Sequence, residues 1–400
     1  MAGSVWKRMP LGEVVTLQRG FDLPASQRQF GHVPVVSSSG ITFAHSEAKV
    51  KAPGVVTGRY GTIGLVFYIT EDYWPLNTTL YVKDFKGNDP RFVSYLLQTI
   101  HFASYSDKSS VPGVNRNHLH LAEVDCPPIA EQRAIAAILG ALDDKIDLNR
   151  RMNRTLEEMA RALFKEWFVD GAEEKWENKP VSDIFEVNPL RPLRKGVTAT
   201  YLDMANLPTQ GHRAVEWVKR PYGSGTRFIN GDTLLARITP CLENGKTAFV
   251  DFMSDAEIGW GSTEFIILHP RPPFTPEFGY YLARDDSFRN HVIRNMTGTS
   301  GRQRAPASCL DLYFFAVPPA QLVGKFGDFA RSTMSKVRAN DEECRTLASV
   351  RDTLLPKLIS GELRVNKAES EIVRPRTAEE EARARAYVRH LRPNDRYRPR

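Results

Sequence analysis

The chain has 400 residues, of which 42% are hydrophobic and 25% are charged, and its formal net charge is +7. This length suits two or three domains of a water-soluble globular protein, and no apolar run approaches the roughly eighteen residues of a membrane span. The first residues lack the pattern of a secretory signal, and the four cysteines lie far apart, so we expect a cytoplasmic protein without disulfides.

The charge is unevenly distributed along the chain. Residues 366–400 hold ten Lys/Arg and six Asp/Glu. Because such a composition buries little apolar surface, we expect this tail to be disordered or partly helical, with non-specific phosphate contact as the functional alternative. The remaining body is mildly basic, which permits nucleic-acid binding without requiring it.

The first part of the chain predicts short β-strands. Residues 55–69, VVTGRYGTIGLVFYI, place apolar stretches on both sides of three glycines, and residues 77–82, NTTLYV, form another candidate strand. Glycines permit positive φ and close backbone approach, so the first stretch is typical of a hairpin that presses against a partner. A short helix is predicted around 90–103, and a polar, basic loop follows at 106–120.

A long helix is predicted from Ala130 to Phe168. This run contains no proline, and residues of one face recur every seven positions. The stripe consists of Ile135, Leu142, Asn149, Leu156 and Leu163. Such a helix would be roughly 58 Å long.

The same pattern occurs again 191 residues later. The stripe then becomes Phe326, Thr333, Asn340, Leu347 and Leu354, and Pro127-Pro128 falls on Pro318-Pro319. Upstream, PRFVSYLL at 90–97 resembles PEFGYYLA at 276–283. We infer a tandem repeat of module, long helix, module and long helix; the alternative is two unrelated domains that each end in a helix.

Two helices with matching stripes are expected to pack on each other. Asn149 and Asn340 lie near the centres of 130–168 and 321–359, so their amides would bond each other and set the register. A parallel pair would also align them, although the topology favours an antiparallel pair, and the alternative is that each asparagine faces water. An antiparallel pair would hold the modules further apart than one DNA turn of about 34–36 Å, which suggests a bipartite target.

Polar loops in both modules hold the candidate DNA-contact residues, because Arg, Lys, Asn and Gln side chains bond base edges and phosphates. In the first module the candidates are Arg59, Tyr60, Lys108, Asn115, Arg116 and Asn117. In the second module they are Arg237, which aligns with Arg59, and Lys246, Arg302, Gln303 and Arg304. The alternative for each residue is a solvated surface position.

No catalytic or metal-binding motif is complete. Gly245-Lys246-Thr247 lacks the first glycine of a phosphate-binding loop, since Pro240 occupies that position. Glu47-Ala48-Lys49 has the ExK spacing of many metal-dependent nucleases but no convincing partner acid. We therefore predict a chain without catalysis, metal or cofactor; the alternatives are a single-chain nuclease or methyltransferase that uses Glu47 and Lys49, and a protein scaffold that binds no DNA.

Several stretches resemble a known family. PPIAEQRAIA (127–136), within 124–170, resembles the central conserved region of the specificity subunits of type I restriction–modification systems. LLPKLISGE (354–362), within 317–365, resembles their distal conserved region, and RYGTIG (59–64) resembles part of their target-recognition domains.

The repeat and the resemblance together predict an α+β fold. It comprises two tandem mixed α/β target-recognition domains separated by two long antiparallel coiled-coil helices in a pseudo-twofold internal repeat. The predicted segments are target-recognition domain 1 at 1–127, the central helix at 128–170, target-recognition domain 2 at 171–317, the distal helix at 318–363 and a tail at 364–400.

The resemblance implies a non-catalytic DNA-recognition subunit of a restriction endonuclease and methyltransferase complex. Each domain would read one half of a bipartite double-stranded DNA target, and the helices would set the spacer and dock two adenine-methyltransferase modification subunits. S-adenosylmethionine would be bound by those subunits, and ATP and Mg by motor–nuclease restriction subunits, so none of these cofactors would bind this chain. Candidate docking residues are Arg150, Arg151, Arg154, Glu157, Glu158, Phe164 and Trp167; for the two aromatic residues the alternative is packing against a module.

Overall fold

The computed structural model describes residues 6–105, 113–299 and 301–365. The chain divides into two compact units, of which unit 1 comprises Met1–Lys145 and Thr346–Arg400 and unit 2 comprises Ile146–Arg345. The predicted DNA contact Lys108 and the charged tail lie outside the described residues. Within the described ranges, no helix combines the length and the apolar character needed to cross a bilayer.

Unit 1 is built on small β-sheets. A four-stranded antiparallel sheet has the order β2-β8-β5-β6, a three-stranded sheet has the order β4-β3-β7, and β1 pairs with β9. The strands are β1 (Lys7–Pro10), β2 (Thr16–Arg19), β3 (Val33–Ser37), β4 (Gly40–His45), β5 (Gly54–Gly58), β6 (Val66–Ile69), β7 (Trp74–Pro75), β8 (Thr79–Asp84) and β9 (Glu123–Cys126). Every residue of β5 is buried, so both faces of the larger sheet are covered.

Helices cover these sheets. They are α1 (Leu11–Val14), α2 (Pro90–Gln98) and α3 (Arg116–Leu119). Helix α2 begins where Asp89 accepts hydrogen bonds from the backbone N–H groups of Arg91 (3.0 Å) and Phe92 (2.9 Å), and a proline occupies its first turn. Its apolar face packs on β5 and β6, which places it in the core of unit 1.

Unit 2 follows the same plan with longer loops. Its sheets have the orders β11-β18-β15-β16 and β13-β12-β17-β14, and β10 pairs with β19. The strands are β10 (Asn178–Pro180), β11 (Phe185–Val187), β12 (Thr198–Leu202), β13 (Val218–Pro221), β14 (Thr226–Phe228), β15 (Thr233–Ala236), β16 (Thr247–Phe249), β17 (Gly259–Gly261), β18 (Phe265–Pro270) and β19 (Phe314–Ala316). The helices outside the long pair are α5 (Val181–Ile184), α6 (Pro276–Arg284) and α7 (Asp286–Arg294).

The repeat inferred from the sequence is visible in the strand pairing. In unit 1, β3 pairs in parallel with β7 and places Val35 opposite Trp74. In unit 2, β12 pairs in parallel with β17 and places Tyr201 opposite Trp260. Helix α6 begins with a proline, like α2, and packs on β15, β16 and β18. The two units therefore share these pairings, and unit 2 adds β14 at the edge of its second sheet.

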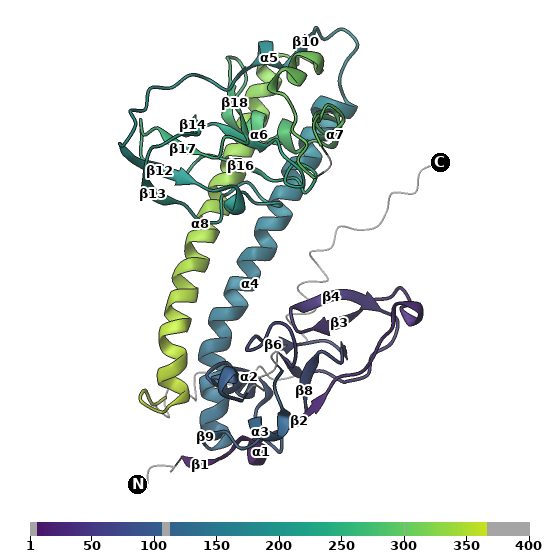
Figure 1. Ribbon diagram of the computed structural model, residues 1–400, viewed down its shortest axis with the longest axis vertical. Coiled ribbons are helices and arrows are strands. Elements are labelled where there is room, and N and C mark those ends of the chain that lie inside the picture. Colours follow the sequence, from purple (N-terminus) through teal and green to yellow (C-terminus); the bar gives the residue numbers. More distant parts are fainter. Residues whose placement is uncertain (1–5, 106–112, 300, 366–400) are drawn as a thin grey trace. The chain divides into compact units, whose positions relative to one another are not determined.

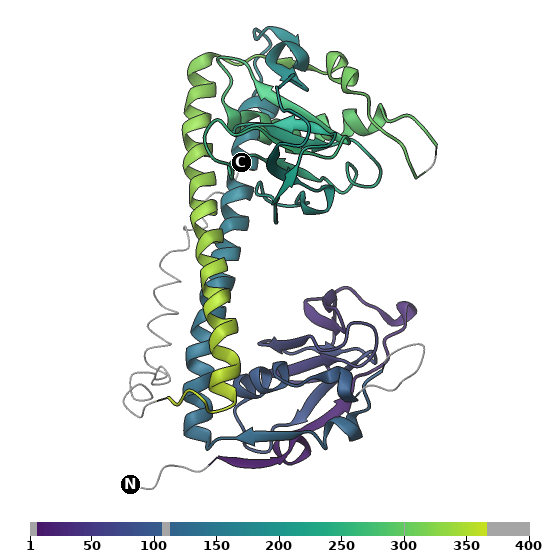
Figure 2. The same cartoon turned by 60° about the vertical axis from the view of Figure 1, so that its left-hand side comes forward.

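The two long helices are α4 (Ile129–Lys165), which continues as a short π-helical turn over Glu166–Asp170, and α8 (Ala320–Ile359). Figures 1 and 2 both show a stretch of α4 beside a stretch of α8 within each unit. In unit 2 the rings of Phe164 and Phe326 are 5.4 Å apart, and the Cys344 thiol lies 3.7 Å from the Ile146 carbonyl oxygen. The contacting residue numbers increase along α4 as they decrease along α8, so this stretch of the pair is antiparallel.

The polar centre of the helix pair differs from the prediction. Asn149 donates to Glu343 (2.7 Å), and Asn340 donates to Asn153 (2.8 Å), which in turn donates to Asp341 (2.8 Å). The prediction that Asn149 and Asn340 bond each other is therefore wrong. The observed register places Asn149 about one helical turn away from Asn340, which is too far for direct contact. Neither amide faces water, since the two residues are 0% and 1% exposed.

Candidate nucleic-acid interface

A basic hollow in unit 1 brings together predicted residues from two distant segments. Arg59 and Tyr60 follow β5, and the Val114 N–H donates to the Arg59 carbonyl oxygen (2.9 Å). A bridge between Tyr60 and Gly113 extends this contact. Because Asn115 and Arg116 come next in the chain, both segments open onto one hollow, whose lining is Arg19, Arg59, Tyr60, Leu80, Val114, Asn115 and Arg116.

The hollow is positively charged. Among the described residues, no acidic side chain lines it. The Arg59 guanidinium lies 4.5 Å from the centre of the Tyr60 ring, which orients the guanidinium without neutralising it. Arg19, which the sequence analysis missed, contributes a third guanidinium, although Asp22 lies 3.3 Å away. The Asn115 side chain caps α3 by accepting from the Asn117 N–H (3.0 Å), so its carbonyl oxygen has a structural role. Asn117 and Arg116 are exposed.

Unit 2 uses the same backbone connection for its candidate residues. The Ala305 N–H donates to the Arg237 carbonyl oxygen (2.9 Å), as Val114 does to Arg59, and the Thr239 N–H donates to the Gln303 carbonyl oxygen (3.0 Å). Thr297 and Arg304 exchange two backbone hydrogen bonds and close a hairpin that carries Arg302 and Gln303. We call residues 297–299 and 301–304 the basic hairpin.

The charged side chains around the basic hairpin differ in availability. Arg302 is exposed, whereas Arg304 forms an ion pair with Glu264 (2.8 Å). Arg237 is half-buried. Lys246 has an internal role instead of the predicted DNA contact, because its ammonium donates to the carbonyl oxygens of Met204 (2.8 Å) and Ala205 (3.2 Å).

The predicted docking residues separate into exposed and buried ones. Arg150 and Arg154 are exposed on α4. Phe164 is only 1% exposed, because the rings of Phe168 and Phe278 lie 5.3 Å and 5.0 Å from it. The prediction that Phe164 is docking surface is therefore wrong, and packing against the module is the correct alternative. Trp167 is half-buried and packs on the same cluster.

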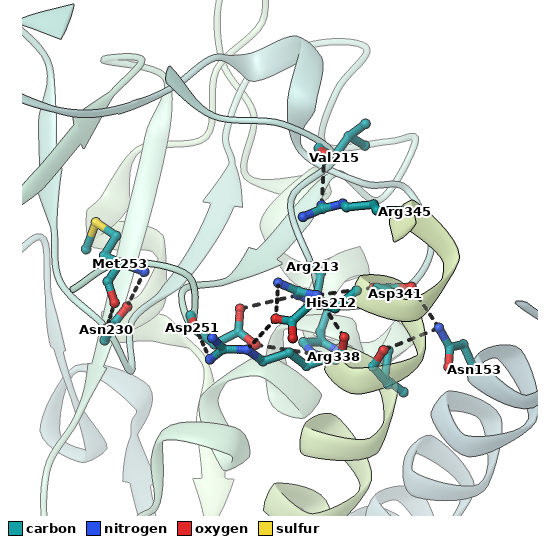
Figure 3. Close-up of polar contacts among 12 residues, drawn as sticks. Asn153, His212, Arg213, Val215, Asn230, Asp251, Met253, Arg338, Asp341 and Arg345 are labelled. Atoms are coloured by element: carbon teal, nitrogen blue, oxygen red, sulfur yellow. Dashed lines mark hydrogen bonds and ion pairs between the residues drawn. The ribbon is translucent and has the colours of Figure 1, made fainter. Parts of the chain in front are cut away.

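A buried charge network joins the module of unit 2 to its stretches of α4 and α8 (Figure 3). His212 is fully buried between Glu157 of α4 (3.9 Å) and Asp251, which follows β16 (3.8 Å). Arg338 of α8 donates to the Asp251 carbonyl oxygen (2.8 Å), and Asn153 reaches the same region from α4. Glu157, predicted to face outward, is thus a buried structural residue, also bonded by the Tyr280 hydroxyl (2.6 Å).

The network shifts the titration of its members. Burial alone would lower the pKa of His212, but the carboxylates of Asp251 and Glu157 outweigh it and raise the pKa above its ordinary value. Burial would likewise raise the pKa of Glu157, but His212 and Tyr280 lower it. When His212 is protonated, its charge lies between two carboxylates and stabilises the packing of this module on the helices.

The residues of the nuclease alternative lie in unit 1. Lys49 lies 3.7 Å from Glu47 and 4.7 Å from the centre of the Trp74 ring. In the described ranges, no group of three or more His, Cys, Asp or Glu side chains is placed to hold a metal ion. Glu47 and Lys49 thus form an exposed pair beside a tryptophan.

Known proteins resemble this chain in sequence and in fold. Residues 4–158 match the family described as the type I restriction modification DNA specificity domain. The MjaIX specificity subunit of a type I restriction enzyme from Methanocaldococcus jannaschii is 24% identical over 316 residues, which cover 69% of each chain. The EcoEI specificity subunit of Escherichia coli is 30% identical over 176 residues, which cover 38% of this chain and 27% of that protein.

A solved structure shares the fold. The S subunit of a type I restriction-modification system from M. genitalium superimposes with a TM-score of 0.59 at 15% identity, over 89% of this chain and 96% of that one. The repeated sequence, the shared α+β topology and these relatives agree. Residues 4–158 therefore carry the type I specificity domain, and the chain as a whole resembles specificity subunits of type I restriction–modification systems.

Proposed function

We propose that this chain reads a bipartite double-stranded DNA target, with one half read by each module. The observation that carries this proposal is the repeated basic site. An arginine, Arg59 or Arg237, directly follows a strand, and the backbone N–H of Val114 or Ala305 in a polar loop donates to the carbonyl oxygen of that arginine. Arg59, Tyr60, Asn115, Arg116 and Asn117 are the contacts in the first module. Arg237, Arg302, Gln303 and Arg304 serve the second.

In this proposal the long helices set the distance between the two half-sites. Helices α4 and α8 have 37 and 40 residues, so each is about 55–60 Å long, which exceeds one turn of duplex DNA at about 34–36 Å. The predicted layout, with target-recognition domains separated by an antiparallel coiled coil, is part of this proposal. The antiparallel pairing within unit 2 supports it.

We further propose that the outward helix face docks two adenine-methyltransferase modification subunits. Arg150 and Arg154 support this, because they are exposed one helical turn apart on α4 and are free of ion pairs with the described residues. Those partners would bind S-adenosylmethionine, and motor–nuclease restriction subunits would use ATP and Mg.

An exchange of modules tests the proposal. Residues 1–127 are replaced by the corresponding module of a relative, and the preferred target is determined by selection from random duplexes. We expect one half of the target to change and the other half to persist. A change in both halves, or in neither, contradicts the two-reader mechanism.

The enzyme alternative needs a separate assay. The full chain is incubated alone with duplex DNA, magnesium and S-adenosylmethionine, and strand cleavage and methyl transfer are measured. We expect neither reaction. Activity that Glu47→Gln and Lys49→Gln abolish would favour the alternative.

A further inference from the structure

The outer face of the sheet β13-β12-β17-β14 in unit 2 is a second cationic surface. Backbone register aligns Tyr201 with Trp260 and Trp260 with Arg227 across neighbouring strands. Because side chains alternate along a strand, these residues lie on the face opposite Leu202 and Phe228, which are in the core. The row therefore lies on the outer side of the sheet, where Tyr201 and Arg227 are half-buried and Trp260 is covered by its neighbours (8% exposed).

Aromatic rings hold two guanidinium groups on this face. Arg220 lies 4.7 Å from the centre of the Tyr201 ring, and Tyr201 lies 4.5 Å from Trp260. On the other side, Tyr222 lies 5.4 Å from Trp260 and Arg227 lies 6.0 Å from Tyr222. We call these five residues the cation–aromatic face.

The two arginines keep their charge available. Neither has an ion pair with a described residue, whereas the neighbouring Lys219 is paired with Glu257. The acid beside the face, Asp203, already accepts from the Tyr201 hydroxyl (3.3 Å) and the Ala205 N–H (2.8 Å). Contact with a ring orients a guanidinium but leaves its N–H donors free for an anion.

The width of this sheet suits duplex DNA. Arg220 and Arg227 lie on the two outer strands of a four-stranded sheet, so about three strand spacings, or about 14 Å, separate those strands. The major groove of B-DNA is about 12 Å wide. One duplex lying on the sheet would present phosphates to both guanidiniums.

The cation–aromatic face is continuous with the basic hairpin. Strand β17 ends at Gly261, and three residues later Glu264 forms the ion pair with Arg304 of the hairpin. The Glu264 carbonyl oxygen also accepts from the Arg237 N–H (3.0 Å). The segment after β17 thus connects the outer face with residues already proposed to contact DNA.

Unit 1 has a related arrangement on the corresponding sheet. Lys49 lies 4.7 Å from the ring of Trp74, which is the counterpart of Trp260 in the parallel strand pair. Arg28 lies 4.4 Å from the ring of Phe43 on β4. Both modules therefore place cations against aromatic rings in this part of the repeat, which gives Lys49 a context other than catalysis.

We propose that the cation–aromatic face of unit 2 binds backbone phosphates of double-stranded DNA that flank the bases read by the basic hairpin. The inference rests on the proposed function and adds a sequence-independent anchor to it. Arg220 and Arg227 each contact one phosphate, and the aromatic rings position them. Since phosphate contacts carry no base information, the anchor contributes affinity and salt dependence, not target choice.

The test is a salt titration with the full chain and a labelled mixed-sequence duplex. Each phosphate contact contributes about 0.9 to the slope of log K against log salt. We expect Arg220→Gln with Arg227→Gln to reduce the slope by about 1.8, with the base preference of the selected target unchanged. The charge-preserving Arg220→Lys with Arg227→Lys variant should keep a slope close to that of the native chain.

Arg345→Gln is the matched control, because Arg345 is an exposed arginine of the same unit whose guanidinium lies 5.4 Å from the Trp217 ring. An unchanged slope in the double glutamine variant overturns the inference, and so does an equal reduction in the control. Loss of assembly with modification subunits while DNA binding stays normal also overturns it, since the face would then be a protein interface. If the native chain binds no duplex, the proposed function itself fails.

Hydrogen exchange of the native chain gives a second measurement that does not depend on the folding of a variant. Addition of the duplex should slow exchange of backbone amides in β13 and β14 as well as in the basic hairpin. Protection of the hairpin alone would contradict the proposed anchor and leave the reading role of the module intact.

Discussion

Truncation of Phe164 should destabilise unit 2, because this side chain lies at the centre of an aromatic cluster. Its ring is 5.0 Å from Phe278, 5.3 Å from Phe168, 5.4 Å from Phe326 and 6.4 Å from Tyr281. These rings come from α4, α6 and α8 and from the turn after α4. Phe164→Ala would therefore open a cavity where the module meets both long helices.

The expected cost follows from burial and ring contacts. A buried Phe→Ala change costs about 3–5 kcal/mol, and each aromatic pair adds about 0.5–1.5 kcal/mol beyond area burial. With Phe164 only 1% exposed, we expect the upper part of that range, about 4–5 kcal/mol. For a unit of this size, each kcal/mol moves the melting temperature by about 2–4 °C, so the transition should fall by about 8–20 °C.

Calorimetry of the full chain measures this change. Trp167→Ala is the matched control, because Trp167 belongs to the same turn but is half-buried, and its truncation should cost less than half as much. An unchanged transition of unit 2 in Phe164→Ala, combined with loss of partner docking, would refute the assignment of Phe164 to the core.

Three further perturbations address the network, the register and the spacing. Protonation of His212 stabilises the folded chain because the pKa of this side chain is raised above 6.5. The contribution is complete below pH 6.5 and is lost as the pH rises through the higher pKa of the folded state. The melting temperature of the native chain should therefore fall with rising pH more steeply than that of His212→Gln. Asn340→Leu should cost about 1–3 kcal/mol in chemical denaturation, because it leaves the half-buried Asn153 oxygen without its donor. If the double variant Asn153→Leu/Asn340→Leu loses as much stability as the two single variants together, the two residues are not coupled. Insertion of about seven residues into both α4 and α8 should lengthen the preferred DNA spacer by about three base pairs in target selection, since it adds about 10 Å; an unchanged spacer would disprove the ruler role.

The repeat and the long helices were predictable from the sequence for a local reason. Helical hydrogen bonds join residues four apart, so a helix is specified by residues of its own segment. The heptad stripe that includes Ile135 and Leu163 therefore predicts the helix without reference to distant parts of the chain. The predicted spans 130–168 and 321–359 accordingly agree closely with α4 and α8. The prolines that precede both helices marked the shared boundary of the two copies.

The candidate site was predictable only as separate segments. Arg59 and Arg116 were each selected for their chemistry, but the backbone bond between Arg59 and Val114 joins residues far apart in the chain. Arg19 offered no comparable signal, because its place in the hollow depends on the pairing of β2 with β8. Strand pairing is a non-local interaction, and no local period specifies its partner.

Tertiary packing alone decided which individual polar side chains are buried and which partners they contact. Glu157 has the spacing of a solvated helix face, yet Tyr280 and His212 bury it. Asn149 contacts Glu343 because the register of the two helices differs by about one turn from centre-to-centre alignment. A periodic stripe determines which face of a helix is buried, but the shift along the axis depends on how the side chains of both helices interlock. Composition and period therefore determined the repeated α+β architecture of this protein, whereas register, burial of charge and the alignment of cations on a sheet face arose from contacts between distant segments.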